Sequence, residues 1–171
     1  EIHKLLDDVR SVAGLPAKGS KRTGVVAAGA FFLSSNQIGA VVKSLQSRSP
    51  ETVSELVHRA QKICTRRFDL LGYRDLDFGS DINWSLDPIS GKQAPLIPWR
   101  RVPYLDFEQV GDHKVTWELS RHQHLTVLAR AWRLSGEEKF LYEALDQFRD
   151  WRRKNPYPKG IHWTSALEVA F

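Results

Sequence analysis

The sequence has only one cysteine and no long apolar run, and each of these features excludes certain classes of protein. One thiol forms no internal disulfide and says little about the redox compartment. Cys64 falls on an apolar helical face, so we predict a small core residue rather than a nucleophile. No run is long enough to cross a bilayer, so no membrane span is predicted. Residues 25–33 only faintly resemble a signal sequence, because they begin late and lack a cleavage site, and we expect a buried segment.

Motifs of several common chemistries are also missing. There is no Gly-x-Ser-x-Gly, Walker loop or dinucleotide fingerprint, so no cofactor is predicted. Helix-turn-helix, zinc-finger and RNP patterns are absent, so no nucleic-acid partner is expected. There is no His-Glu-x-x-His and no cysteine pair. His122 and His124 lie two positions apart on one predicted helix and would point away from each other, so no metal site is predicted.

Basic charge and tryptophan are what the sequence does contain. Its 171 residues, enough for one domain or part of a larger one, carry a net charge of +5 and six tryptophans. Considered without motifs, the charge suits polyanions such as nucleic acids, acidic glycans or membrane surfaces, and a solvated basic face is the alternative.

The first part of the chain has the weakest signals. We assign residues 1–48 to an N-terminal helix of about fifteen residues followed by a poorly assigned segment. Glycine, lysine and serine at 16–24 indicate a loop. The chain begins with Glu1 and ends in an apolar helical run, so we expect a fragment of a longer protein.

Residues 49–171 show strong helical periodicity. A helix with one solvent-exposed side is predicted to begin around Ser49, Pro50 and Glu51, and its apolar face extends to Phe68. Its opposite face carries Glu55, Arg59, Lys62 and Arg66. A second helix, predicted from about 112 to 134, is apolar almost all round, with a wet arc of Gln123, Thr126, Arg130 and Arg133. A third, from about 137 to 153, has a single apolar stripe, and a fourth starts near 163–164.

The segment at about 70–111 interrupts this pattern. Glycines and prolines punctuate it, and tryptophans and aspartates are interleaved between them. A loop this long is usually functional or disordered, and its many large apolar residues argue against disorder. We therefore predict an ordered loop packed across the helices.

One-sided helices alternating with buried helices indicate the fold class. We predict an all-α partial α/α toroid of antiparallel helical hairpins, spanning 49–171. An α-solenoid is the alternative, but its repeats would have similar lengths, and here the helical pairs are unequal.

Arg121 is the residue with the most unusual predicted setting. It falls among apolar residues and beside tryptophan, where an unpaired charge would destabilise the fold. One interpretation is a structural salt bridge to Glu118. The other is a cleft in which Arg121 offers a planar fork to a carboxylate or sulfate while Trp117 provides a flat platform for a sugar ring.

Several ordered motifs resemble one family. They are residues 67–72 (RFDLLG), 81–84 (DINW), 111–122 (GDHKVTWELSRH), 155–156 (NP) and 160–168 (GIHWTSALE). In this order they resemble the N-terminal domain of heparinase II/III-like polysaccharide lyases, which are related to alginate lyases. The resemblance covers about residues 60–171.

The resemblance implies an incomplete α/α toroid followed, in full-length relatives, by a β-sandwich. Such enzymes cleave uronic-acid glycans by β-elimination, which needs a neutralised carboxylate, a base for the C5 proton and an acid for the departing O4. In the family an asparagine or histidine polarises the carboxylate, and tyrosine and histidine move protons. Those residues lie in later helices and the sandwich, so we expect the chain to be truncated before them and inactive alone, and we assign no catalytic residue.

The resemblance also implies substrate-binding positions that shape the floor and rim of a cleft. The candidates are Asn83, Trp84, Trp117, Glu118, Arg121, His122, Asn155 and Trp163. The implied partners are an acidic polysaccharide and the missing toroid helices and β-sandwich of the parent chain. Lyases that digest external polymer are usually periplasmic or secreted, and a cytoplasmic location is the alternative.

Three functions follow from the sequence. The first is the N-terminal part of a polysaccharide lyase that acts on acidic glycans. The second is a non-enzymatic helical module that binds polyanions or carbohydrate. The third is a structural helical domain without a ligand.

Overall fold

The computed structural model describes residues 35–170. The helix predicted over the first fifteen residues, the loop at 16–24 and the segment at 25–33 lie outside the described residues. The chain divides into two compact units, Glu1–Val41 and Val42–Phe171, and every side-chain contact given below lies within the second. None of the helices in the described part combines the length and the apolar character needed to cross a membrane.

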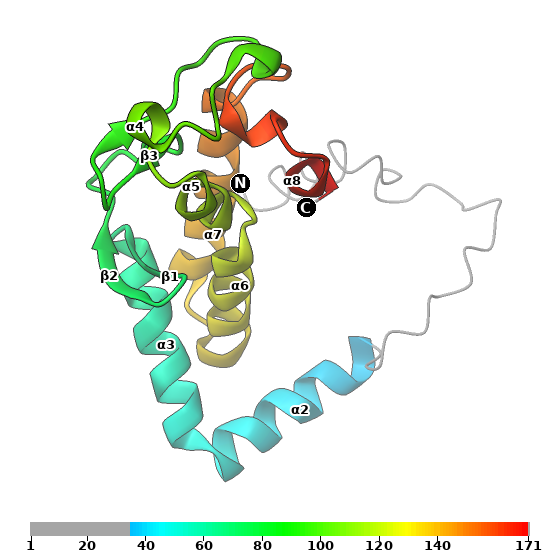
Figure 1. Ribbon diagram of the computed structural model, residues 1–171. Coiled ribbons are helices and arrows are strands. Elements are labelled where there is room, and N and C mark those ends of the chain that lie inside the picture. The colour runs from blue at the N-terminus through cyan, green and yellow to red at the C-terminus, as the bar shows by residue number, and fades with distance from the viewer. Residues whose placement is uncertain (1–34, 171) are drawn as a thin grey trace, which may run out of the picture. The chain divides into compact units, whose positions relative to one another are not determined.

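Helices make up most of the described chain, in agreement with the predicted all-α class (Figure 1). The helices are α2 (Ser35–Arg48), α3 (Pro50–Cys64), α4 (Phe107–Val110), α5 (His113–Ser120), α6 (Gln123–Ser135), α7 (Glu138–Lys154) and α8 (Ala166–Ala170), with 3-10 turns η1 (Trp99–Arg101) and η2 (Ile161–Trp163). The strands are β1 (Arg67–Leu70), β2 (Tyr73–Asp77), β3 (Leu86–Asp87) and β4 (Lys92–Gln93), in two antiparallel hairpins. Helix α2 lies in the segment that the sequence left unassigned.

Helix α3 begins where the sequence predicts. Pro50 stands at its first position and Glu51 in its first turn, and both suit a helix N-terminus. Its buried face ends with Ile63. Cys64 packs half-buried against the core, and burial raises the pKa of its thiol to about 11. The thiol is therefore protonated at neutral pH and behaves as a small apolar residue, as predicted.

The helix predicted from 112 to 134 is two helices. It breaks between α5 and α6, where His122 adopts a left-handed conformation with φ of 58°. The periodicity continues across the break because both helices keep their apolar residues at helical spacing, so the pattern alone does not reveal it. Helix α5 is buried on most sides, whereas α6 exposes the predicted wet arc, including Thr126 and Arg130.

Helix α7 matches its prediction to within one residue at each end, and α8 begins later than predicted. Gly136, in the left-handed conformation, ends α6, so α6 and α7 form a tightly connected antiparallel hairpin. Helices α3, α6 and α7 pack against one another. The turn η2 occupies Ile161–Trp163, and α8 starts only at Ala166.

The predicted long loop contains short regular elements. Phe68, expected on the face of α3, lies instead on β1 and pairs with Leu76 of β2. The segment at about 70–111 includes β2, the second hairpin, η1 and α4. It supplies residues to two hydrophobic clusters, so it is built into the core, as predicted. The larger cluster includes Phe68, Phe78, Ile82, Trp84, Leu119, Leu128 and Phe140, and the smaller comprises Ala94, Val102, Val110, Trp117 and Ile161.

Asp87 ties the second hairpin to the start of α5. This buried carboxylate accepts hydrogen bonds from Ser90 Oγ (2.6 Å), Ile89 N (3.0 Å) and Asp112 N (2.9 Å). Although burial opposes ionisation, these hydrogen bonds lower the pKa of Asp87 overall. Gly111 lies directly against it: a Cβ there would be 2.5 Å from Asp87 Oδ2. With a φ of 73° as well, this position accepts only glycine.

Candidate functional site

Arg121 forms an ion-pair network at the C-terminus of α5. Its Nη1 donates to Glu118 Oε2 at 2.7 Å, while Nε and Nη2 donate to the two carboxylate oxygens of Glu168 at 3.0 and 2.8 Å. The side chain of Glu168 is only 5% exposed. The predicted pair with Glu118 is thus present, and a second carboxylate occupies the guanidinium fork. The network ties α8 to α5.

Removing the Glu168 charge should destabilise the chain measurably. We expect Glu168→Gln to lower the free energy of unfolding by about 1–3 kcal/mol, because charge-assisted hydrogen bonds to a buried carboxylate are lost. Urea unfolding of Glu168→Gln, Arg121→Gln and the double variant would give the coupling energy. Glu108→Gln is the control, because Glu108 is 94% exposed and its bond to Lys92 is a surface pair. Equal losses in Glu168→Gln and Glu108→Gln would contradict this.

Trp84 lies at the centre of a buried aromatic cluster that includes histidines. It is 2% exposed, and its Nε1 donates to Asp150 Oδ2 at 2.9 Å. The rings of His124 and His122 lie against it, with centroids at 6.3 and 6.0 Å. Trp151 continues the cluster: its ring centroid is 5.0 Å from that of His122, and its Nε1 donates to Ser120 Oγ.

Burial keeps the histidines of this region neutral. It lowers the pKa of His122 to about 4, of His162 to about 4 and of His124 to about 3. The prediction that His122 and His124 point apart was wrong, since the break before α6 leaves their ring centroids 6.0 Å apart. Within residues 35–170, no three His, Cys, Asp or Glu side chains group as they would around a metal ion.

The structure brings together only some of the predicted substrate-binding residues. Asn83, Trp84 and Asn155 border one cavity of about 290 Å³, beside Lys154. Asn155 is buried, and its side chain donates to the carbonyl of Trp151, so it caps the C-terminus of α7. The remaining predicted residues lie elsewhere, in the Arg121 network, the aromatic cluster or the smaller hydrophobic cluster.

The two outlying tryptophans occupy different settings. Trp117 is 9% exposed, donates through Nε1 to the carbonyl of Ile161 at 3.0 Å and packs in the smaller cluster. Trp163 is half-buried, and its ring lies against those of Trp151 and Tyr157. Trp117, like Trp84, is therefore covered by other parts of the chain and presents no free ring face to solvent, whereas Trp163 is only partly covered.

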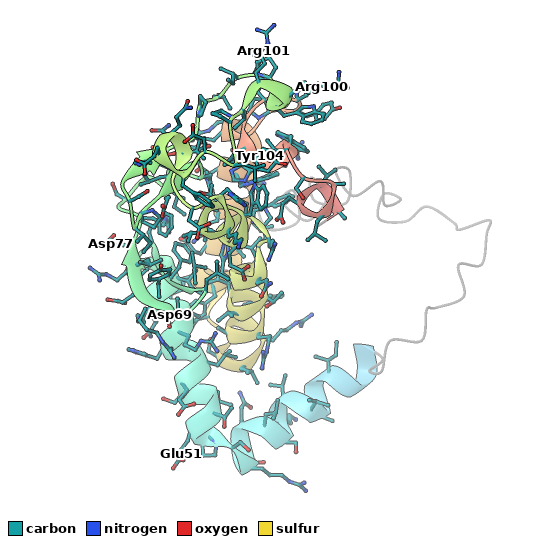
Figure 2. The ribbon with its side chains drawn as sticks, in the orientation of Figure 1. Glu51, Asp69, Asp77, Arg100, Arg101 and Tyr104 are labelled. Atoms are coloured by element: carbon teal, nitrogen blue, oxygen red, sulfur yellow. The ribbon has the colours of Figure 1, made fainter. Side chains whose placement is uncertain are left out.

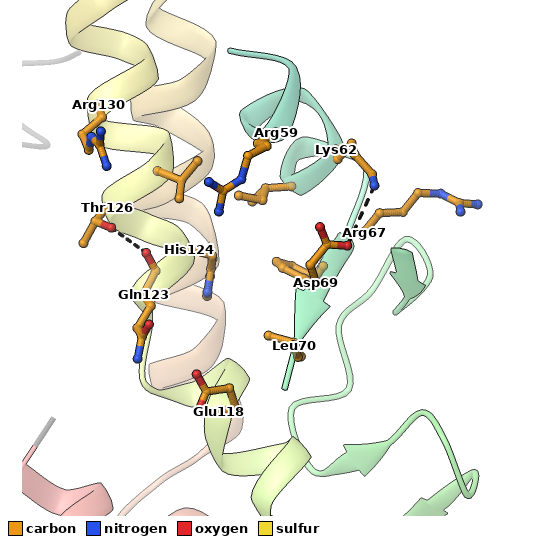
Figure 3. Close-up of a pocket in the computed structure, with 13 residues that line it drawn as sticks. Arg59, Lys62, Arg67, Asp69, Leu70, Glu118, Gln123, His124, Thr126 and Arg130 are labelled. Atoms are coloured by element: carbon orange, nitrogen blue, oxygen red, sulfur yellow. Dashed lines mark hydrogen bonds and ion pairs between the residues drawn. The ribbon is translucent and has the colours of Figure 1, made fainter. Parts of the chain in front are cut away.

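A second cavity, of about 310 Å³, lies between α3, β1 and α6 (Figure 3). Its lining includes four cationic side chains from three elements: Arg59, Lys62, Arg67 and Arg130. We name it the basic pocket. Of the residues predicted to bind substrate, only Glu118 lines it.

Sequence reasoning placed Arg59, Lys62 and Arg130 on wet helix faces but did not join them into a site. The missing information is tertiary, because α3 and α6 are separated in sequence by two hairpins, η1, α4 and α5. A usable signal was the basic character of both wet faces, since facing basic surfaces suit an anionic ligand.

Comparison with known proteins assigns the family. The profile described as "Heparinase II/III N-terminus" matches residues 30–170. The chain belongs to this family. The match includes the resembling motifs, the Arg121 network and both cavities.

The curated relatives of this heparinase II/III N-terminal chain are bacterial. A "Heparin-sulfate lyase" of Bacteroides stercoris is 40% identical over 63 residues, 37% of this chain and 9% of the relative. The protein of the same name from Pedobacter heparinus is 31% identical over 85 residues, 50% of this chain and 10% of the relative. That of Bacteroides thetaiotaomicron is 30% identical over 86 residues, 50% of this chain and 12% of the relative. The matched segments thus span about a tenth of each relative. No solved structure matches the chain.

Proposed function

We propose that this chain is the N-terminal part of a polysaccharide lyase that cleaves uronic-acid-containing acidic glycans by β-elimination and contributes part of the substrate cleft. The family match over residues 30–170 carries the proposal. The relatives named as heparin-sulfate lyases support the substrate class. A cavity whose lining has four cationic side chains and two carboxylates supports an anionic ligand.

The division of labour follows from the reaction. β-Elimination needs a group that neutralises the uronate carboxylate, a base for the C5 proton and an acid for the leaving O4. The buried histidines are neutral but enclosed by aromatic rings, and we assign them no proton transfer. The parent chain's later helices and β-sandwich would supply the catalytic groups, while this part holds and orients the glycan.

The architecture we propose is a partial α/α toroid. The antiparallel α6–α7 hairpin, with α3 packed along it, is consistent with the first hairpins of such a ring. In this arrangement Trp84, Trp117 and His122 fix the cleft wall from within, while Asn83 and Trp163 lie nearer the surface. We also propose a periplasmic or secreted location, which fractionation of the source cells would test.

The decisive experiment compares this chain with the longer protein that contains it. Each would be incubated with heparin-like and alginate-like polymers, and the ultraviolet absorbance of the unsaturated uronate product recorded. We expect product from the longer protein and none from the 171 residues alone. Eliminase activity of the isolated chain, or a longer protein inert on every acidic glycan, would refute the proposal.

The basic pocket also favours a second candidate, a polyanion-binding module without chemistry. Titrating the chain with acidic glycans and DNA at several salt concentrations would separate the two. Similar binding to both polymers, steeply weakened by salt, is the result expected of the module.

A further inference from the structure

The basic pocket has the size and lining of a small-ligand site. Its volume of about 310 Å³ is at the lower end of the range typical of such sites. Its apolar lining is formed by Ile63, Phe68, Leu70 and Val127, and its polar lining includes Arg59, Gln123, Thr126 and Arg130. An apolar surface beside convergent polar groups is what a sugar ring bearing a charged substituent requires.

Two of the four cations are already neutralised. Lys62 Nζ lies 2.7 Å from Asp75 Oδ1, and Arg67 donates to Asp75 Oδ2 at 2.7 Å and to Asp77 Oδ2 at 2.9 Å. Two carboxylates also line the pocket: Glu118 is paired with Arg121, and Asp69 with Lys62 and Arg74. These ion pairs leave the charges of Arg59 and Arg130 without a counter-charge in the pocket.

Arg59 and Arg130 have no ion pair among the described residues, and both side chains are exposed. Figure 3 shows Arg59 extending from α3 toward α6, the helix that carries Arg130. The pocket therefore holds two guanidinium groups from two elements, neither of which has a counter-ion among the described residues.

The N-terminus of α6 adds to the same potential. Gln123, its first residue, lines the pocket, and no side chain caps this end of the helix. The first turn of α6 contains no acidic residue. Unsatisfied N–H groups and the helix dipole at a 13-residue helix N-terminus favour an anion nearby.

We propose that the basic pocket binds a sulfate group on one sugar of the acidic glycan, with Arg59 and Arg130 holding its oxygens. The identity of the ligand rests on the proposed function. A sulfate presents several oxygens to two guanidinium forks, and the Gln123 side-chain amide donates to the same group or to a sugar hydroxyl. The apolar lining contacts the C–H face of the ring. The pocket thereby selects sulfated segments, separately from the chemistry of cleavage.

The test measures binding to the full 171-residue chain rather than cleavage. A sulfated heparin tetrasaccharide and its chemically desulfated counterpart would be titrated calorimetrically. The double variant Arg59→Gln/Arg130→Gln would be compared with Arg100→Gln/Arg101→Gln, which makes the same charge change at η1. Figure 2 shows Arg100 and Arg101 well apart from Asp69, which lines the pocket. Unchanged thermal unfolding would verify that both variants fold.

We expect the pocket variant to bind the sulfated tetrasaccharide about tenfold more weakly, and the η1 variant less than twofold more weakly. We also expect amide NMR shifts on binding to concentrate at Gln123, Thr126 and their neighbours. Equal losses in the two variants would overturn the proposal, because diffuse charge would then explain binding. Equal affinity for the desulfated sugar would also overturn it, because the pocket would then recognise the carboxylate.

This outcome is separable from that of the lyase proposal. If the longer protein has no eliminase activity but the pocket variant still binds the sulfated tetrasaccharide selectively more weakly, the sulfate-site proposal stands and the lyase proposal fails. If the longer protein is an active lyase but the sulfated tetrasaccharide binds equally to the wild-type chain and the pocket variant, the lyase proposal stands and the sulfate-site proposal fails.

Discussion

Replacing Trp84 by alanine should lower the free energy of unfolding by about 3–5 kcal/mol, as is usual for a fully buried tryptophan. The side chain is 2% exposed in the larger hydrophobic cluster, so truncation leaves a cavity that the surrounding helices only partly fill. It also removes the Nε1 donor to Asp150 and the ring against which His124 packs. Since the free energy of unfolding of a whole domain is about 5–15 kcal/mol, this one substitution removes a large fraction of it. Urea unfolding monitored by circular dichroism would measure it.

Two control variants separate the contributions. Trp84→Phe keeps an aromatic ring but loses the bond to Asp150, so we expect a smaller loss, about 1–2 kcal/mol. Trp99→Ala removes a half-buried tryptophan in η1 whose ring lies 5.2 Å from the Arg100 guanidinium carbon, and we expect about 1 kcal/mol. Losses within 1 kcal/mol of each other for Trp84→Ala and Trp99→Ala would contradict the central packing role of Trp84.

Acidification should unfold the chain between about pH 6.5 and pH 4. Burial lowers the pKa of His122, His124 and His162 to between about 3 and 4, whereas an unfolded histidine titrates near 6.5. Above pH 6.5 these histidines are neutral in both states, and their contribution to stability is fully present. As the pH falls toward 4, the unfolded state binds protons that the folded state does not, so stability decreases.

The slope of stability against pH is the measurement. Three histidines that protonate only on unfolding give a slope approaching about 4 kcal/mol per pH unit. The carboxyls of Asp87 and Asp150 also have lowered pKa values, because their hydrogen bonds outweigh the effect of burial. Their contribution is lost only as the pH falls below about 3.8, so it does not obscure the histidine window.

His122→Asn provides the matched control for this slope. Asparagine tolerates the left-handed conformation at position 122 but does not titrate, so the slope between pH 6 and 4.5 should decrease by about one third. Comparing slopes rather than absolute free energies removes the cost of the lost ring contacts. A free energy of unfolding that stays flat from pH 6.5 to 4.5 in the unmodified chain would contradict the neutral buried state of these histidines.

The elements that the sequence predicts correctly are those whose signals are local. Helices α3 and α7 each have one apolar stripe and a recognisable start, so periodicity places both starts and the end of α7 to within a residue, whereas α3 ends at Cys64, well before the predicted Phe68. The turn between α5 and α6 depends on the backbone conformation of His122, which periodicity does not report. The β1–β2 hairpin did carry a signal, alternation in residues 67–70 before Gly72, but Phe68 was assigned to the preceding helix.

The same distinction applies to the candidate site. Glu118 and Arg121 are three residues apart, so their ion pair follows from helical spacing. Glu168 binds the same guanidinium from a distant part of the chain, and no spacing rule predicts that contact. Likewise, Arg59 and Arg130 face a common cavity only because α3 packs on α6. Facing side chains on different elements are a product of tertiary packing, which a single sequence does not contain.

The close approach of Gly111 to Asp87 has a consequence for recognising distant members of this family. A side chain at position 111 has no room, because its Cβ would lie 2.5 Å from Asp87 Oδ2 and from Ser90 Oγ. A residue at 87 without a carboxylate would no longer bind the amide of Asp112. The two positions are thus coupled across 24 places in the sequence. We expect relatives that keep this contact to carry an aspartate followed at that interval by Gly-Asp.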